Sequence, residues 1–342
     1  MDWRVFCIPF LPLVFVGIIS LSVEMMSAAA EDDEVELCAS CGITGGDDIK
    51  LKRCTACHLV RYCGVKCQKE HRPKHKKECK KRAAELRDEL LFKQPESTHL
   101  GDCPICCLPL PIDLSIDSKE AVFMTCCSKL ICRGCNVANL KRELDGRLEH
   151  KCPFCRIVLT RSEEEINRRL MKRIEANDPV AICNLGTMKF NEGDFKAACE
   201  YWTRAAALGD VNAHYQLSVS YHYGKGVEKN QKKELLHLEQ AAIGGHTLAR
   251  NNLGCMEEEN GRLDRAVKHL IIAAKLGFDP SLEFLKILYR AGHVNKEDFE
   301  AALRGHKAAI EATKSPQRKE AAELSSMPCK CGKKECTERG NC

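Results

Sequence analysis

The sequence predicts a mainly α-helical protein in which two small cysteine-rich finger modules precede an α-helical solenoid. Most of the 24 cysteines lie within residues 38–79 and 103–156, largely in Cys-x-x-Cys pairs. Between residues 178 and 315 the chain instead repeats, with leucines and glycines recurring at separations of 32 and 36 residues. A length of 342 residues suits two or three domains, in agreement with this division.

The cysteine pattern favours metal binding over a disulfide scaffold. In a Cys-x-x-Cys pair one tight turn directs two thiolates at the same ion, and four such ligands close the tetrahedral site of a structural zinc ion. We therefore expect three to four structural Zn²⁺ ions and a reducing compartment, the cytoplasm or the nucleus. The net charge of +5 is small for this length and gives no reason to expect a nucleic-acid partner.

Residues 1–30 form a hydrophobic leader that is harder to interpret. No charged residue occurs between Val5 and Val23, a length that suits a signal sequence or a membrane anchor. Such a leader would export the cysteine-rich modules into an oxidising space, which conflicts with zinc binding. Two interpretations remain open: a membrane anchor through residues 5–23, or translation that starts at Met25 or Met26 and leaves the leader unused.

Residues 38–79 hold eight candidate metal ligands, enough for two closed sites: Cys38, Cys41, Cys54, Cys57, Cys63, Cys67, His75 and Cys79. Their spacing resembles a MYND-type zinc finger. The resemblance implies two interleaved sites, the first made by Cys38, Cys41, Cys63 and Cys67, and the second by Cys54, Cys57, His75 and Cys79. Because His75 has the family spacing to Cys79, we expect the nearby His71 to be solvated.

Two further features bear on what this finger binds. MYND-type fingers commonly carry a tryptophan after the position of His71, where it helps to shape a groove for proline-rich peptides, and this chain has Arg72 there. Peptide binding by this finger is therefore a weaker expectation. The lysines and arginine between Lys74 and Arg82 would attract an acidic partner or form a solvated helix face.

Residues 103–156 hold a second set of thiols in four pairs: Cys103 and Cys106, Cys126 and Cys127, Cys132 and Cys135, and Cys152 and Cys155. The set resembles a degenerate RING-type zinc finger, in which ligand pairs one and three share one ion and pairs two and four share the other. The resemblance assigns Cys103, Cys106, Cys132 and Cys135 to one zinc ion, and Cys127, Cys152 and Cys155 to the other.

The fourth ligand of that second ion departs from the RING pattern. The family usually has a histidine two residues after its third ligand, where this chain has Lys129, which is a donor at neutral pH and a poor ligand. Either Cys126 or His150 must complete the site, or the site is weak or empty. We expect Cys126, because an adjacent thiol needs less rearrangement of the loop.

Three residues match positions with which RING-type ubiquitin ligases contact a ubiquitin-conjugating enzyme: Ile105, Pro153 and Arg156. The resemblance therefore implies that enzyme as a candidate partner. The structural alternative is that Ile105 fills the knuckle and Arg156 is a solvated charge. In neither case is a residue of this chain catalytic, because a RING ligase acts by positioning a reactive thioester.

Two linker helices are expected beside the fingers. Residues 83–95 have the pattern of a short amphipathic helix that Pro95 stops. Residues 161–176 form the second, in which Ser162 and Glu165 make a capping box and apolar residues follow at helical spacing.

The repeats of residues 178–315 have the pattern of paired helices. In each unit a leucine marks the first helix and a glycine follows the alanine-rich second helix, the leucines being Leu185, Leu217 and Leu253 and the glycines Gly209, Gly245 and Gly277. Alanines let paired helices approach closely, and glycine ends a helix in a left-handed cap. The pattern resembles Sel-like repeats, relatives of the tetratricopeptide class, with the unit from Pro280 degenerate. The resemblance implies a helical solenoid that binds proteins or peptides.

The aromatic residues of the repeats have two interpretations. They could line the partner-binding surface, but at these spacings aromatic residues are more often core: Tyr201, Trp202, Tyr215, Tyr221 and Tyr223. Three cysteines in this region are expected to be small buried residues and not ligands: Cys183, Cys199 and Cys255.

Residues 316–342 form a polar tail with four cysteines, Cys329, Cys331, Cys336 and Cys342. Their spacing is similar to the cysteine cluster that follows SET methyltransferase domains, but the Asn-His-Ser motif of those enzymes is absent from the sequence. A small zinc knuckle and a cysteine tail without metal are both open. Phosphate-binding loops, zinc-protease motifs and nucleophile elbows are also absent from the sequence.

The combination of a MYND-type finger, a degenerate RING-type finger and Sel-like repeats resembles multi-domain proteins abundant in diatoms. It implies a zinc-binding scaffold or adaptor that holds proteins or peptides on its repeats and its MYND-type finger. The alternative is a RING-type ubiquitin ligase whose repeats select the substrate. The scaffold requires only that the fingers fold, and Lys129 favours it.

Overall fold

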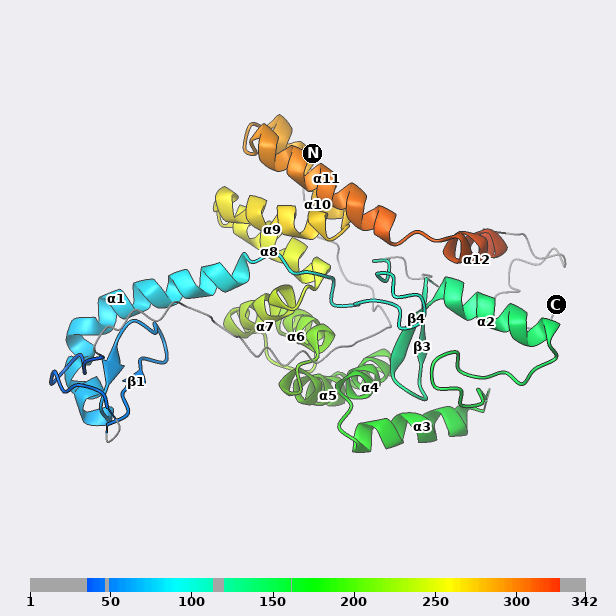
Figure 1. The fold of residues 1–342 in the computed structure, drawn as a ribbon, viewed down its shortest axis with the longest axis horizontal. Helices are drawn as coiled ribbons and strands as arrows, with labels where there is room; N and C mark the ends of the chain where they lie inside the picture. Colours follow the sequence, from blue (N-terminus) through cyan, green and yellow to red (C-terminus); the bar gives the residue numbers. More distant parts are fainter. Residues whose placement is uncertain (1–35, 47–48, 113–119, 161, 327–342) are drawn as a thin grey trace. The chain divides into compact units, whose positions relative to one another are not determined.

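The computed structural model describes residues 36–46, 49–112, 120–160 and 162–326 (Figure 1). The hydrophobic leader of residues 1–30 and the four cysteines of the tail lie outside the described residues. The chain divides into two compact units, one ending at Lys93 and the other beginning at Gln94, and each is described by itself.

The first unit is a small hairpin followed by one long helix. Strands β1 (Lys52–Arg53) and β2 (Arg61–Tyr62) pair antiparallel, with Lys52 opposite Tyr62. Helix α1 (Val65–Leu91) has 27 residues, and its core-facing side carries ligand candidates of the finger. The expected linker helix of residues 83–95 is therefore wrong as a separate element: it is the second half of α1, which ends at Leu91, before Pro95.

The second unit begins with a hairpin and a helix. Strands β3 (Ala121–Met124) and β4 (Lys129–Cys132) pair antiparallel, and helix α2 (Arg133–Asp145) follows at once. Cys132 caps α2, because its sulfur accepts a hydrogen bond from the backbone N–H of Cys135 at 3.4 Å. Apolar residues of the hairpin pack with the ligand cysteines in one small core.

Helix α3 (Glu163–Glu175) joins this module to the repeats. It begins after Ser162, whose hydroxyl accepts a hydrogen bond from the backbone N–H of Glu165, as the capping pattern predicts. The side chain of Arg173 donates to the hydroxyl of Ser128 at 3.3 Å, and Val180 of the first repeat packs into the core of the hairpin module. The module that contains the β3–β4 hairpin and the first repeat therefore pack against each other.

The repeats form four antiparallel helix pairs in chain order, stacked as the labels in Figure 1 show. Their first helices are α4 (Pro179–Asn191), α6 (Val211–Tyr223), α8 (Thr247–Glu259) and α10 (Asp279–Arg290). Their second helices are α5 (Phe195–Ala207), α7 (Gln231–Ile243), α9 (Leu263–Lys275) and α11 (Lys296–Ala312).

Small residues let the two helices of a pair approach closely. A Cβ atom at Gly186 would lie 2.7 Å from the ring of Trp202, which is 1% exposed. The glycines that follow the second helices adopt the left-handed conformation, with φ of 89° at Gly209, 83° at Gly245 and 93° at Gly277. The expected caps are confirmed.

The aromatic residues divide between core and surface. Trp202 and Tyr215 are buried, Tyr201 and Tyr221 are partly buried against the core, and Tyr223 is 40% exposed. The core interpretation therefore holds for the first two and fails for Tyr223. Cys183, Cys199 and Cys255 are buried, as expected.

Helix α12 (Pro316–Ser326) follows the repeats and packs against α2. A helix was not expected in this polar tail. Among the described helices, none combines the length and the apolar character that crossing a membrane requires.

Candidate metal centres

Sixteen side chains converge in four groups of four, and within each group the ligand atoms lie within 4.8 Å of one another. The groups are Cys38, Cys41, Cys63 and Cys67; Cys54, Cys57, His75 and Cys79; Cys103, Cys106, Cys132 and Cys135; and Cys126, Cys127, Cys152 and Cys155. The interleaved pairing is the one that the two family resemblances imply.

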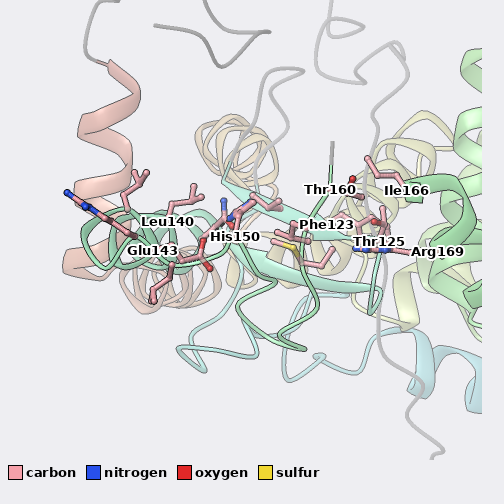
Figure 2. Close-up of a pocket in the computed structure, with 15 residues that line it drawn as sticks. Phe123, Thr125, Leu140, Glu143, His150, Thr160, Ile166 and Arg169 are labelled. Carbon is pink, nitrogen blue, oxygen red and sulfur yellow. Dashed lines mark hydrogen bonds and ion pairs between the residues drawn. The ribbon is translucent and has the colours of Figure 1, made fainter. Parts of the chain in front are cut away.

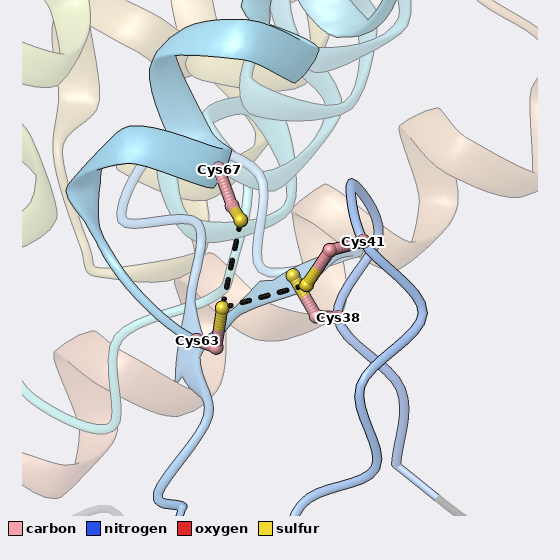
Figure 3. Close-up of side chains that lie close together, drawn as sticks. All are labelled: Cys38, Cys41, Cys63 and Cys67. Atoms are coloured by element: carbon pink, nitrogen blue, oxygen red, sulfur yellow. Dashed lines mark hydrogen bonds between the residues drawn. The ribbon is translucent and has the colours of Figure 1, made fainter.

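The first group of the N-terminal finger joins the loop before β1 to the start of α1 (Figure 3). The sulfurs of Cys41 and Cys63 are 3.6 Å apart, and those of Cys63 and Cys67 are 3.5 Å apart. A tetrahedral site with zinc–sulfur bonds of about 2.3 Å separates neighbouring sulfurs by about 3.8 Å. Backbone N–H groups of Cys41 and Cys63 donate to the sulfur of Cys38 and lower its pKa to about 6, which favours the thiolate that metals bind.

The second group of this finger contains its only nitrogen ligand candidate. His75 and Cys79 lie one turn apart on α1, while Cys54 and Cys57 lie on a knuckle between β1 and β2. The sulfurs of Cys54 and Cys79 are 3.7 Å apart, and the Cys57 sulfur is 3.1 Å from Nε2 of His75. The helical spacing of four residues thus places both ligands on the side of α1 that faces the knuckle.

His71 lies outside this group of ligand candidates, as expected. It is not solvated as predicted, however, because its side chain packs against neighbouring residues. Its ring stacks on that of His75 with centroids 5.7 Å apart, and its Nδ1 is 3.1 Å from the hydroxyl of Tyr62. His71 therefore packs behind a ligand candidate and is partly buried. The signal in the sequence was its position one turn before His75 on the same helix face.

The module of residues 103–156, which contains the β3–β4 hairpin and α2, is called the RING-like module after its cysteine pattern. Its first group surrounds the start of α2. The sulfurs of Cys106 and Cys132 are 3.8 Å apart, and the backbone N–H of Cys132 donates to the sulfur of Cys103 at 3.4 Å. The thiol of Cys132 also donates to Cys103 and lowers the pKa of Cys103 to about 4. The same contact raises the pKa of Cys132.

The second group of this module consists of four thiols, including Cys126. The sulfurs of Cys127 and Cys152 are 3.9 Å apart, and those of Cys155 and Cys126 are 3.4 Å apart. His150, the alternative to Cys126, instead places its Nδ1 2.7 Å from Oε2 of Glu143. Lys129 points elsewhere, with its Nζ 5.8 Å from the centroid of the Phe154 ring.

All four groups fit structural zinc. Each offers four sulfur or imidazole donors, the ligand types that zinc prefers, at separations close to those of a tetrahedral site. Every cysteine in the described residues is a free thiol. Zinc bound there would cross-link loops and helices that share few apolar contacts, and it would leave no coordination position open for a substrate.

The three residues expected to contact a conjugating enzyme differ in exposure. Ile105 is 41% exposed and Arg156 is exposed, whereas Pro153 is buried. Arg156 has a φ of 64°, a left-handed conformation in which it closes the last knuckle. Ile105 and Arg156 are therefore available to a partner, and Pro153 supports the knuckle from inside.

A cavity of about 940 Å³ lies beside the second group of the RING-like module (Figure 2). Its walls come from β3, α2, the segment after α2 and the start of α3, and the labelled lining residues include Phe123, Leu140 and Ile166. Glu143 is one of the lining residues. Burial opposes the charge of this carboxylate, but donors on His150, the backbone N–H of Lys151 and Asn139 lower its pKa overall. Glu143 therefore holds the segment after α2 in place.

Arg318 of α12 reaches the first group of the RING-like module, which sequence reasoning missed. Its Nη2 donates to the sulfur of Cys106 at 3.5 Å and to the carbonyl of Leu108 at 3.1 Å, and its Nη1 donates to the carbonyl of Pro109 at 2.6 Å. These contacts span 209 to 212 residues of sequence, a separation at which spacing carries no signal.

The segment before the RING-like module lies on the repeats. The backbone N–H of His99 donates to the carbonyl of Gly245 at 3.1 Å, and the rings of His99 and His246 stack with centroids 4.1 Å apart. A Cβ atom at Gly245 would lie 2.7 Å from the carbonyl of Ser97, so this close approach requires glycine. The contact fixes the connecting segment onto the turn between α7 and α8.

Two family profiles match the chain. The MYND finger matches residues 38–79, and the Sel1 repeat matches residues 179–210, 211–246 and 247–278. The chain therefore contains a MYND zinc finger and three Sel1 repeats, as expected. The expected degenerate RING finger has no support from these matches.

Three curated proteins are similar to short parts of this chain. "Putative beta-lactamase HcpC" of Helicobacter pylori is 39% identical over 56 residues, which is 16% of this chain and 19% of that protein. "Histone-lysine N-methyltransferase SMYD3" of Homo sapiens is 55% identical over 31 residues, 9% of this chain and 7% of that protein. "SET domain and MYND-type zinc finger protein 6" of Schizosaccharomyces pombe is 40% identical over 48 residues, 14% of this chain and 10% of that protein. The chain thus spans less than a fifth of each of these relatives.

Two solved structures are also similar. One is a Sel1 repeat protein from Oxalobacter formigenes, with 22% identity, a TM-score of 0.38, and coverage of 56% of this chain and 77% of that one. The other is c5321, described as a protective antigen of uropathogenic Escherichia coli strains displaying an SLR fold. It has 22% identity, a TM-score of 0.35, and coverage of 50% of this chain and 38% of that one.

Proposed function

We propose that this chain, which joins a MYND zinc finger to three Sel1 repeats, is a zinc-stabilised scaffold that holds protein partners on its helical repeats. The observation that supports the proposal is that each of the four candidate metal groups offers four donors, enough to close a tetrahedral site. A catalytic zinc keeps a coordination position open for water or substrate, whereas a closed site serves folding. The free thiols that zinc requires suit a reducing compartment, the cytoplasm or the nucleus.

The repeats supply a rigid surface with exposed apolar side chains. Tyr223 at the end of α6 and Leu236 of α7 belong to the same repeat, and they are 40% and 53% exposed. Exposed aromatic and aliphatic side chains on a rigid support are the usual anchors of protein interfaces. We assign the partner-binding role to this repeat, and a second binding role to the MYND finger.

The test is to crosslink the full chain to its partners in cell extract and to locate the crosslinks by mass spectrometry. We expect crosslinks within residues 179–312, and a double variant Tyr223→Ser, Leu236→Ser should weaken the affinity of the same partner about tenfold. The matched control is Leu144→Ser, which changes an exposed leucine outside the repeats. The scaffold proposal fails if no partner crosslinks to the repeats of folded protein, or if the control weakens binding equally.

A RING-type ubiquitin ligase is the second candidate, and one observation favours it. Cys126 lies within 4.8 Å of the other three thiols of its group, so Lys129 does not deprive the second site of a fourth ligand. Ile105 and Arg156 are also exposed. Autoubiquitination by the full chain, across a panel of conjugating enzymes, tests this candidate. Ubiquitin chains that disappear in Ile105→Ala and in Arg156→Ala would make the protein a ligase, and no chains from zinc-loaded protein would exclude it.

A further inference from the structure

Helix α12 packs on the RING-like module at the place where two ligand cysteines meet α2. Gly134 lies between Cys132 and Cys135, and a Cβ atom there would lie 2.7 Å from the backbone nitrogen of Arg318. Lys141 and Glu320 form an ion pair farther along the same two helices, and Ala321 is buried. The close approach at Gly134 shows that α12 is fitted to this surface and is not a loosely attached tail.

Arg318 makes the most specific contacts of this helix. Its guanidinium reaches three acceptors on the first knuckle: the sulfur of Cys106 and the carbonyls of Leu108 and Pro109. A fourth acceptor is the carbonyl of Thr313 at 2.7 Å, just before α12. The side chain is 8% exposed, so this charge is removed from water and depends on these partners.

The chemistry of the four cysteines explains why a cation belongs there. Four thiolates around one Zn²⁺ leave a net charge of −2 in a mostly buried group. A guanidinium that donates to one of the sulfurs offsets part of that charge and fixes the orientation of the ligand. Without metal, nothing holds the four sulfurs together, so the acceptors of Arg318 on the first knuckle lose their fixed positions.

We infer that Arg318 is a positioning residue for the zinc site of Cys103, Cys106, Cys132 and Cys135, and that α12 is a clasp whose docking on α2 depends on that zinc. The inference rests on zinc occupancy at this group and not on the identity of any partner. Coupling is reciprocal: if docked α12 strengthens zinc binding, zinc must strengthen the docking of α12 by the same factor.

The first experiment measures zinc release from the full zinc-loaded chain to a chromogenic chelator, and it compares Arg318→Ala with the unmodified protein. Loss of an outer hydrogen bond to a metal ligand typically weakens metal affinity about 10- to 100-fold. We therefore expect one ion of the set to leave at least tenfold faster, with alkylation and mass spectrometry showing Cys106 among the first thiols labelled. Release at the unmodified rate would overturn the role of Arg318.

Two further variants keep this experiment interpretable. Lys319→Ala removes an exposed cation from the same helix, one that pairs with Glu323, and it should release zinc at the unmodified rate. Arg318→Lys keeps the charge but loses the forked geometry, and should lie between the two. If Lys319→Ala and Arg318→Ala accelerate release equally, a general charge effect replaces the specific contact and the inference is wrong.

The clasp is tested by hydrogen exchange of the unmodified full chain before and after removal of zinc. We expect the amides of α12 to exchange at least tenfold faster in the zinc-free protein, while those of α9 in the repeats keep their protection. Arg318→Ala loaded with zinc should show the same loss of protection in α12. Equal protection of α12 with and without zinc would overturn the clasp, whatever the partners of the repeats prove to be.

Discussion

The fingers and the repeats are held together by different forces. In the RING-like module the buried core is small, and four of its nine buried members are ligand cysteines. In the first repeats the core consists mainly of alanines, leucines, isoleucines and Trp202, with helices that approach closely at Gly186. We therefore expect the finger fold to depend on metal, whereas the repeat fold depends on burial of apolar surface. One chain thus carries two independent requirements for folding.

Removal of metal should have the largest effect, because it should unfold the fingers and leave the repeats folded. We expect a strong chelator to unfold residues 38–156, because thiolates and loops without zinc have too few apolar contacts to stay ordered. Helices α6 to α9 should keep their helical signal. Circular dichroism with hydrogen exchange on the full chain measures both responses.

The response to metal removal should be mixed where the RING-like module meets the first repeat. Val180 packs into the core of the RING-like module, so the first turn of α4 should lose protection together with that module. Equal loss in α4 and in α8 would contradict the division into two folding requirements. Loss restricted to residues before α4 would contradict the packing of Val180.

Sequence reasoning found the ligand groups and missed contacts that lie far apart in the chain. Spacing places Cys103 and Cys106 on one knuckle, and adjacency was sufficient to prefer Cys126 over His150. No local pattern links Arg318 to Cys106, because the two residues lie 212 positions apart in the sequence. That each group binds zinc stays a prediction, since spacing and convergence show only that the donors fit.

The linker helix expected over residues 83–95 is another point at which sequence and structure differ. The amphipathic pattern of residues 83–95 predicts a separate short helix, but the backbone of α1 continues without a break from Val65 to Leu91. Pro73 lies within this helix and does not end it. Residues 80–91 are mostly strong helix formers, so the helix continues past the last ligand candidate.

Loss of Trp202 should destabilise the repeats, whose fold depends on burial of apolar surface. Trp202 is buried, and its Nε1 donates to the carbonyl of Cys183 at 3.2 Å. We expect Trp202→Ala to lower the free energy of unfolding of the repeats by about 3–5 kcal/mol, because the substitution leaves a large cavity between α4 and α5. Guanidinium unfolding followed by circular dichroism measures this change.

The control for this variant is Tyr223→Ala, in which an exposed side chain is lost and about 0.5 kcal/mol or less is expected. Zinc content should be unchanged in both variants, because Trp202 contacts no ligand candidate. If Trp202→Ala loses zinc from the MYND finger together with the stability of its repeats, the folding of the finger and the folding of the repeats are coupled.

The smallest expected effect concerns pH and the contact between the connecting segment and the repeats. Burial lowers the pKa of His99 to about 4, and it lowers that of His246 well below its usual value. An unfolded histidine titrates near 6.5, so between about pH 6.5 and 4 the unfolded chain binds more protons than the folded one. This contact therefore contributes its full stability above pH 6.5 and loses it as the pH falls, by on the order of 1 kcal/mol between pH 7 and 5.

The variant His99→Phe isolates this contribution, because a phenyl ring can still stack on His246 but cannot titrate. The midpoint of thermal unfolding should fall less between pH 7 and pH 5 in the variant than in the unmodified chain. Asp210 acts in the opposite direction, since burial raises its pKa to about 6, but it is present in both proteins and cancels in the difference. An equal fall in both proteins would mean that His99 is solvated and that the connecting segment is not fixed to the repeats.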